Sequence, residues 1–218
     1  MAERFDLIVF DWDGTLMDSA GAIVRAIVAS CRDLGLPEPS EERARYVIGL
    51  GLGDALRHAV PELAESDYPR MIERYRHHYL ASDHELTLFP GVVDLLAWLS
   101  EQGRMLGVAT GKSRLGLNRA LGHAGLVARF HSTRCADECF SKPHPAMLEE
   151  IMDELGVEPD RTLMVGDTTH DLLMAKNAGV AALAVSFGAH PARALRAEAP
   201  LACVDTPAEL GRWLRQNV

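Results

Sequence analysis

The sequence predicts an α/β fold: a doubly wound parallel sheet of the Rossmann-like kind, with an inserted all-helical cap. Short apolar runs without helical periodicity, typical of strands buried on both faces, occur four times along the chain. Amphipathic helical patterns separate the later runs, and a long segment after the first run contains only helical patterns. We therefore expect a core of residues 1–17 and 86–218 and a cap of residues 18–85.

The core elements alternate along the chain between strand and helix. The strands are predicted at residues 6–10, 105–109, 162–165 and 182–185. Apolar stripes at helical spacing begin at Val92, Met147 and Leu172, and each ends near a glycine: Gly103, Gly156 and Gly179. A last helix is expected from about residue 207 to 215.

The cap elements follow the first strand. Ile23, Val24, Ile27, Val28 and Cys31 are spaced for one helix, and Pro37 and Pro39 interrupt the chain after it. Ser40 is predicted to cap the next helix, whose first turn carries Glu41 and Glu42. Met71, Ile72, Tyr75 and Tyr79 form a later amphipathic face, and Pro90-Gly91 marks the return to the sheet.

Composition narrows the class of protein. The 218 residues include 22 Lys and Arg against 31 Asp and Glu, a formal net charge of −9. This charge disfavours nucleic acid or an anionic membrane as the main partner. Four scattered cysteines favour free thiols in a reducing compartment, and we see neither a signal-peptide pattern nor an apolar run of membrane-span length. We therefore expect a cytoplasmic protein.

Acidic residues follow two of the predicted strands. Asp11 and Asp13 come directly after residues 6–10, and Asp167 and Asp171 follow residues 162–165. Ligands of open α/β sheets bind beyond the carboxyl ends of the strands, so neighbouring strands would bring Asp11 and Asp167 together. Converging carboxylates are typical ligands of a hard cation, here predicted to be Mg²⁺.

Two further loops suit an anion. Thr110 and Gly111 follow residues 105–109 and precede a helix, where a hydroxyl and backbone amides can bind phosphate. Lys142, between Ser141 and Pro143, also precedes a helix and can neutralise a phosphate or a carboxylate.

Together the four segments resemble the signature of the haloacid dehalogenase superfamily. DWDGT at residues 11–15 is similar to its first motif, Thr110 to the second, Lys142 to the third, and GDTTHD at residues 166–171 to the fourth. The order and spacing match over essentially the whole chain. The helical insert resembles the C1-type cap of the phosphoglycolate phosphatase-like branch.

The resemblance implies a site that transfers a phosphoryl group. Asp11 would be the nucleophile that becomes an aspartyl-phosphate, and Asp13 would act as general acid and then general base. Mg²⁺ would be held by the Asp11 carboxylate, the Asp13 backbone carbonyl and Asp167, with Asp171 ordering its water shell.

The resemblance also implies a phosphate-binding set. Thr110, with backbone amides near Trp12, Asp13 and Gly111, would hold phosphoryl oxygens. Lys142 would offset the negative charge of the nucleophile and of the phosphate. A small phosphorylated metabolite is the expected partner, with phosphoglycolate the favoured substrate by resemblance. The oligomeric state does not follow from the sequence.

Several alternative activities fit the sequence less well. Haloacid dehalogenases lack the second aspartate, and phosphonate hydrolases use a cap lysine, whereas residues 18–85 contain no lysine. A β-phosphoglucomutase-like phosphotransferase is disfavoured because the region around Ile23 is apolar where that branch places a histidine. A non-catalytic phosphate-binding module that kept the fold remains the alternative of another class.

Other polar residues receive plainer interpretations. Lys112 is expected at a solvated helix start, and Arg45 and Arg57 on solvated faces. His170 is interpreted as a neighbour of the metal ligands or a solvent-facing residue, because Mg²⁺ rarely takes imidazole. The glycine-rich stretch at residues 48–57 is expected to connect two cap helices and to close over the site.

Overall fold

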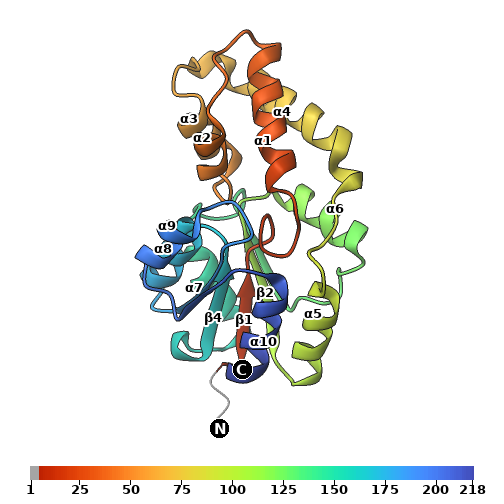
Figure 1. Cartoon of the computed structure of the whole chain (residues 1–218), viewed down its shortest axis with the longest axis vertical. Coiled ribbons are helices and arrows are strands. Elements are labelled where there is room, and N and C mark those ends of the chain that lie inside the picture. The colour runs from red at the N-terminus through yellow and green to blue at the C-terminus, as the bar shows by residue number, and fades with distance from the viewer. Residues whose placement is uncertain (1–4) are drawn as a thin grey trace.

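The computed structural model describes residues 5–218 and contains one six-stranded sheet in the order β3-β2-β1-β4-β5-β6 (Figure 1). All neighbouring strands pair in parallel. The strands are β1 Leu7–Phe10, β2 Met105–Thr110, β3 Ser132–Cys135, β4 Thr162–Gly166, β5 Ala181–Val185 and β6 Ala202–Val204. The predicted fold class is confirmed; residues 1–4, assigned to the core, lie outside the described residues.

The first strand shows why short apolar runs predict the inner strands of this sheet. Leu7 and Val9 face one side and Ile8 and Phe10 the other, since successive side chains of a strand alternate. All four side chains are fully buried, because helices cover both faces. The predicted strands at 105–109, 162–165 and 182–185 are likewise found, each one residue longer at one end.

The helices of the core flank the sheet (Figure 1). Apolar residues of α5, α6 and α10 pack on one face, and those of α7 and α8 on the other. Their bounds are α5 Val92–Glu101, α6 Arg114–Ala124, α7 Ala146–Leu155, α8 Thr169–Asn177, α9 Ala192–Ala197 and α10 Pro207–Asn217, with the 3₁₀ turn η3 at Pro159–Arg161.

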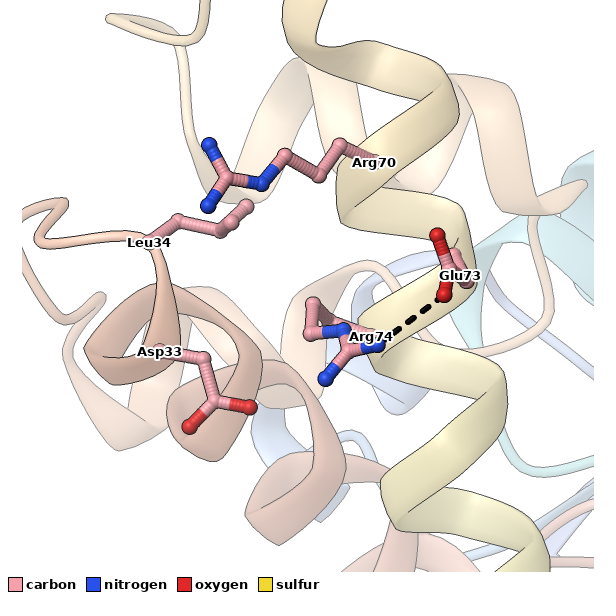
Figure 2. Close-up of a pocket in the computed structure, with 5 residues that line it drawn as sticks. All are labelled: Asp33, Leu34, Arg70, Glu73 and Arg74. Carbon is pink, nitrogen blue, oxygen red and sulfur yellow. Dashed lines mark hydrogen bonds and ion pairs between the residues drawn. The ribbon is translucent and has the colours of Figure 1, made fainter.

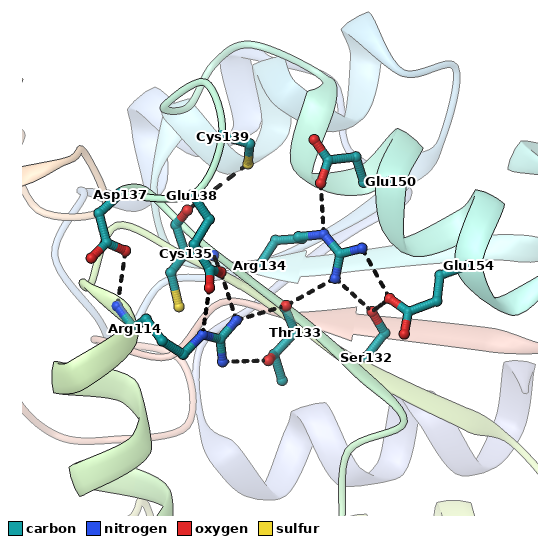
Figure 3. Close-up of polar contacts among 10 residues, drawn as sticks. All are labelled: Arg114, Ser132, Thr133, Arg134, Cys135, Asp137, Glu138, Cys139, Glu150 and Glu154. Carbon is teal, nitrogen blue, oxygen red and sulfur yellow. Dashed lines mark hydrogen bonds and ion pairs between the residues drawn. The ribbon is translucent and has the colours of Figure 1, made fainter.

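Polar edge strands were missed by the sequence interpretation. β3 lies at the end of the sheet, and its side chains include Thr133 and Arg134. Arg134 pairs with Glu150 of α7 at 2.7 Å, and Arg114 of α6 pairs with Glu138 at 2.7 Å (Figure 3). Charged side chains of this kind are common on edge strands. Because of them, the sequence of β3 lacks the apolar run that predicts the inner strands.

The inserted segment forms a separate helical layer beyond the carboxyl ends of the strands (Figure 1). It contains α1 Ala20–Asp33, α2 Glu41–Tyr46, α3 Leu52–Ala59 and α4 Tyr68–Ser82, with 3₁₀ turns η1 Glu65–Asp67 and η2 Asp83–Glu85. Ile27, Leu56 and Met71 belong to its own buried apolar cluster. We propose that residues 18–85 are a distinct domain, called the cap below. Over residues 5–218, no helix has the length and apolar character needed to cross a membrane.

The predicted N-cap of α2 is confirmed, since Ser40 Oγ accepts a hydrogen bond from the Arg43 amide at 3.2 Å.

Burial of the apolar cluster of the cap leads to a prediction about the free energy of unfolding. Met71 of α4 is fully buried, so Met71→Ala is expected to lower the free energy of unfolding by about 2–5 kcal/mol. Leu80 on the same helix is 42% exposed, so Leu80→Ala should cost less than about 1 kcal/mol. Urea denaturation of both variants measures the difference. Equal losses would contradict the burial of Met71 in a cap core.

Candidate active site

The carboxyl ends of β1 and β4 bring three carboxylates together. The two strands are parallel neighbours, with Phe10 opposite Val165, so the loops that follow them meet. Carboxylate oxygens of Asp11, Asp167 and Asp171 all lie within 4.8 Å of one another, and the three side chains are buried. The convergence of Asp11 and Asp167 follows the expectation from the sequence.

Lys142 is the cation of this cluster. Its Nζ donates to Asp11 Oδ1 at 2.6 Å and lies 2.7 Å from Asp171 Oδ1, the latter without hydrogen-bond geometry. The ammonium and both carboxylates are fully buried. Burial opposes the charge of Lys142, but the two carboxylates outweigh it and keep its pKa above its ordinary value.

One ammonium does not balance three buried carboxylates. Burial raises the pKa of Asp11 from 3.8 to about 7, opposed by Lys142 and reinforced by Asp171 and Asp13. Burial and the Asp11 charge raise the pKa of Asp167 as well. Asp11 Oδ2 and Asp171 Oδ1 are buried without a hydrogen-bond partner. Hard oxygen donors, excess negative charge and unpartnered oxygens fit a divalent cation.

Asp167 is held by its neighbours on both oxygens. Thr15 Oγ1 donates to Oδ1 at 2.9 Å, and the Ala189 amide donates to Oδ2 at 2.7 Å. Gly14, at φ +86°, and Gly188 lie so close that a Cβ on either would overlap the carboxylate. These contacts fix the orientation of the carboxylate within the cluster.

Asp171 has two roles in the structure. Its Oδ2 accepts hydrogen bonds from the Thr168 amide at 3.0 Å and the Thr168 hydroxyl at 2.7 Å, closing a capping box at the start of α8. Its Oδ1 faces Lys142. Helix capping therefore orients the other oxygen toward the cluster.

Asp13 lies on the other side of the same loop. Its Oδ1 accepts hydrogen bonds from Ser19 Oγ at 2.6 Å and from Lys112 Nζ at 3.0 Å. Within the described part of the chain, the group of three converging carboxylates does not include Asp13. The loop thus separates the carboxylate of Asp11, inside the cluster, from that of Asp13.

The interpretation of Lys112 as a solvated helix-start residue is wrong. Its side chain is 11% exposed, and its Nζ also donates to the Tyr79 hydroxyl of α4 at 3.0 Å. Burial opposes its charge, but Asp13, Tyr79 and Tyr75 together outweigh burial and raise the pKa of Lys112. The sequence pattern of α6 contains no sign of the cap helix that covers its start.

The predicted phosphate-binding loop lies directly under the cap. Thr110 ends β2 and is buried, and its Oγ1 accepts from the Lys112 amide at 3.2 Å. A Cβ on Gly111 would overlap the backbone carbonyls of Gly49 and Leu50. The expected loop over the site is therefore residues 47–51, which also connect α2 to α3, whereas residues 52–57 are helical.

The side chain of Trp12 packs in the core. It is fully buried and meets Phe130 edge-on at a ring separation of 6.4 Å. The candidate phosphate contact of this residue is its backbone amide.

His170 is buried, so its interpretation as a solvent-facing residue is wrong. Its Nε2 lies 2.7 Å from the backbone carbonyl of Tyr46, at the end of α2. His190 Nδ1 accepts from the Thr169 amide at 3.1 Å, which leaves its Nε2 to donate to the same carbonyl at 3.0 Å. Burial lowers the pKa of both histidines. Two neutral rings thus join the core to the cap.

Arg45 is half-buried and pairs with Glu41 at 3.0 Å, and Arg57 is exposed and pairs with Asp54 at 2.8 Å. Arg57 also lines the cavity described next, so it does not lie on a purely solvated face.

A cavity of about 840 Å³ lies between the cap and the core. Asp13, Lys112 and Ser141 line its catalytic end, and residues of α1, α4 and α6 line its walls. A second cavity, of about 480 Å³, lies where α1 ends and α4 begins, and Arg74 and Glu73 pair there at 2.9 Å (Figure 2). α1 starts beside the carboxylates and is 14 residues long, so this second cavity is about 20 Å from the site.

Several site residues carried no sequence signal. Tyr79, Tyr46 and His190 reach the site from distant segments, and only the fold brings them there. Thr15 is the last residue of the first motif and Ser19 lies four residues after it, and a hydroxyl close to paired carboxylates was a usable signal.

The chain is similar to known proteins in sequence and in structure. A sequence model described as haloacid dehalogenase-like hydrolase matches residues 8–185. The chain is 40% identical over 210 residues to the probable phosphatase IndB of Dickeya dadantii, covering 94% of this chain and 91% of the relative. It is 32% identical to phosphoglycolate phosphatase 1 of Pseudomonas aeruginosa, covering 94% and 78%. A crystal structure of a predicted phosphoglycolate phosphatase from Haemophilus somnus superimposes with a TM-score of 0.87 at 26% identity, covering 98% and 100%.

Proposed function

The chain belongs to the haloacid dehalogenase-like hydrolases and is a phosphatase, and on that premise we propose that it is a Mg²⁺-dependent enzyme that hydrolyses small phosphomonoesters through an aspartyl-phosphate. The observation that carries the proposal is the buried cluster of Asp11, Asp167, Asp171 and Lys142 at the carboxyl end of the sheet. Phosphoglycolate is the favoured small substrate, supported by the names of several relatives. A cytoplasmic location is proposed with it.

Asp11 is the proposed nucleophile. Lys142 holds one of its oxygens, Oδ1, which leaves Oδ2 as the oxygen that would attack phosphorus. The attack forms an O–P bond to Asp11 and breaks the bond to the alcohol. Lys142 offsets negative charge on the carboxylate and the phosphoryl oxygens. The Thr110 hydroxyl and the amides of Trp12, Asp13 and Gly111 would bind those oxygens.

Asp13 is the proposed acid and base. In the first step it protonates the departing alkoxide, and in the second it takes a proton from the water that hydrolyses the aspartyl-phosphate. Ser19 and Lys112 hold its carboxylate in place from two directions.

The proposed metal ligands are the carboxylates of Asp11 and Asp167 and the backbone carbonyl of Asp13, with Asp171 ordering bound water. A bound Mg²⁺ supplies charge neutralisation, which lets the anionic nucleophile approach an anionic phosphate.

The other candidate activities have less support. Ile23 lines the cavity at the position where a β-phosphoglucomutase-like phosphotransferase is expected to place a polar side chain. A non-catalytic binding module would not require a buried nucleophile, a separate acid and a lysine in one site.

Phosphate release from a panel of small phosphomonoesters, phosphoglycolate included, tests the proposal. Release is expected with Mg²⁺ and not with EDTA. Mg²⁺-independent release would contradict the metal requirement, and no release from any compound would support the binding module.

Metal binding is expected to stabilise the protein more at high pH. Without metal, Asp11 keeps its proton up to about pH 7 in the folded state but loses it near pH 3.8 in the unfolded state. The free energy of unfolding therefore falls as the pH rises from about 3.8 to about 7. A divalent cation removes that penalty by binding the ionised form. The gain in Tm from Mg²⁺ over EDTA should therefore be larger at pH 8 than at pH 5.5. A gain independent of pH, or retained in Asp11→Asn with Asp167→Asn, would contradict this site.

Lys112→Met is expected to lower kcat by about tenfold to a hundredfold, because Asp13 loses a charge-assisted hydrogen bond and the link to Tyr79. Lys112→Arg should retain more activity. Lys176→Met, on an exposed part of α8, is the matched control and should leave kcat unchanged. Equal kinetics of the two methionine variants would show that Lys112 does not position Asp13.

A further inference from the structure

The cavity between the cap and the core is much larger than the favoured small substrate needs. Phosphoglycolate displaces about nine waters, roughly 270 Å³, whereas the cavity measures about 840 Å³. Cavities of about 300–1,000 Å³ are typical of sites for ligands of drug size. Most of this volume would remain filled with water beside a two-carbon substrate.

The walls of the cavity are apolar away from the catalytic loop. Ile23 and Ile27 of α1, Ile72 of α4 and Val47 at the end of α2 line it on the cap side, and Leu115 of α6 lines it on the core side. Leu115 is 73% exposed, so its side chain is accessible to a ligand in the cavity.

The charged residues of the wall are partly neutralised from within. Arg119 of α6 pairs with Asp83 at 3.3 Å, which also joins core to cap, and Arg57 pairs with Asp54 at 2.8 Å. At the catalytic end, Lys112 is bound by Asp13 and Tyr79. The cavity is therefore polar where it meets Asp13 and predominantly apolar along α1 and α4, where Arg76 of α4 adds one exposed charge.

From these observations we infer that the preferred substrate is a phosphomonoester of an alcohol with an extended apolar body, which lies against α1, α4 and α6 while the phosphoryl group reaches Asp11. The inference rests on the proposed function and deepens it by naming the class of leaving alcohol. Cap helices supply most of this apolar surface, so selectivity would come from the cap and chemistry from the core.

A series of primary alkyl phosphates tests the inference, because ethyl, butyl, hexyl and 2-phenylethyl phosphate have leaving alcohols of similar basicity. With Mg²⁺, kcat/KM is expected to rise about three- to fourfold for each buried methylene group, which is about 80- to 250-fold from ethyl to hexyl phosphate if all four added methylenes are buried. Hexyl or 2-phenylethyl phosphate should also exceed phosphoglycolate. A flat series, or phosphoglycolate as the best compound, would overturn the inference and leave the phosphatase assignment intact.

Two variants locate the effect in the cavity. Ile72→Asn should flatten the chain-length series. Leu115 is exposed, so Leu115→Gln should not disturb folding. This variant should lower kcat/KM for hexyl phosphate about threefold relative to that for ethyl phosphate. Leu201→Gln is the matched control, since Leu201 is 44% exposed and does not line the cavity. Equal effects of Leu115→Gln and Leu201→Gln would place the apolar contact elsewhere and overturn the inference.

Binding measurements with substrate analogues test this inference independently of the proposed function. Ethyl-, butyl- and hexylphosphonate cannot be hydrolysed, so calorimetric Kd values report on the cavity whether or not turnover occurs. An affinity that rises with chain length supports the apolar site even if no phosphate is released from any substrate. The lack of phosphate release would count only against the phosphatase proposal. Affinity independent of chain length overturns the inference.

Discussion

Asp11→Asn is expected to abolish phosphate release, with kcat reduced by about 10⁴- to 10⁶-fold, the size of effect seen when a catalytic nucleophile is removed. An amide has the same shape as the carboxylate but cannot attack phosphorus. The fold should survive, because burial already disfavours the charged form of Asp11, and Lys142 keeps its ion pair with Asp171. The Tm of the metal-free variant should therefore equal or exceed that of the parent protein.

The matched control is Asp153→Asn, on the exposed side of α7, which should leave both kcat and Tm unchanged. Asp11→Asn with kcat within tenfold of the parent would contradict the nucleophile assignment. A folded but inactive variant, identified by an unchanged circular dichroism spectrum, would support it.

Asp13→Asn is expected to lower kcat for alkyl phosphates by about 10²- to 10⁴-fold, the usual contribution of a general acid or base. Asparagine can still accept the hydrogen bond from Ser19, so the loop should keep its shape. The loss should depend on the leaving group. An alkoxide needs a proton as it departs, whereas 4-nitrophenolate does not, so the first step of 4-nitrophenyl phosphate hydrolysis should be much less affected.

The second step gives an independent readout of Asp13. With 4-nitrophenyl phosphate, Asp13→Asn should release a burst of 4-nitrophenol close to one equivalent per enzyme, followed by slow turnover, because the aspartyl-phosphate forms but lacks its base. Stopped-flow absorbance measures the burst. Equal losses for alkyl and 4-nitrophenyl phosphates without a burst would contradict the acid and base role.

The parts of the fold that could be predicted from the sequence are those buried on both sides. β1, β2, β4 and β5 lie in the middle of the sheet, and double burial gives them continuous apolar runs. β3 and β6 are the edge strands, and they were missed. β3 uses Thr133 and Arg134 in polar contacts with neighbouring helices, and β6 has only three residues, too few for a period to be visible.

The candidate site also contains residues whose positions the sequence predicts and residues whose positions it does not. Asp11 and Asp167 follow strands directly, so their convergence requires only that β1 and β4 be neighbours. Lys112 was misassigned because its surroundings come from Tyr79, 33 residues away in the cap. For His170 the solvent-facing alternative fails for the same reason, since its partner is a carbonyl at the end of α2. Contacts between cap and core depend on how the two layers meet, which no local pattern encodes.

The central claim is that the Asp11 carboxylate forms a covalent bond to phosphorus, and chemical trapping tests it most directly. The enzyme is mixed with Mg²⁺ and a good substrate, quenched in acid, reduced with borohydride and digested, and the peptides are sequenced by mass spectrometry. Borohydride converts an aspartyl-phosphate to homoserine, so the account predicts homoserine at position 11, present only when substrate is added and more abundant in Asp13→Asn. Homoserine at another aspartate, or an unmodified Asp11 in an enzyme caught during turnover, would contradict it.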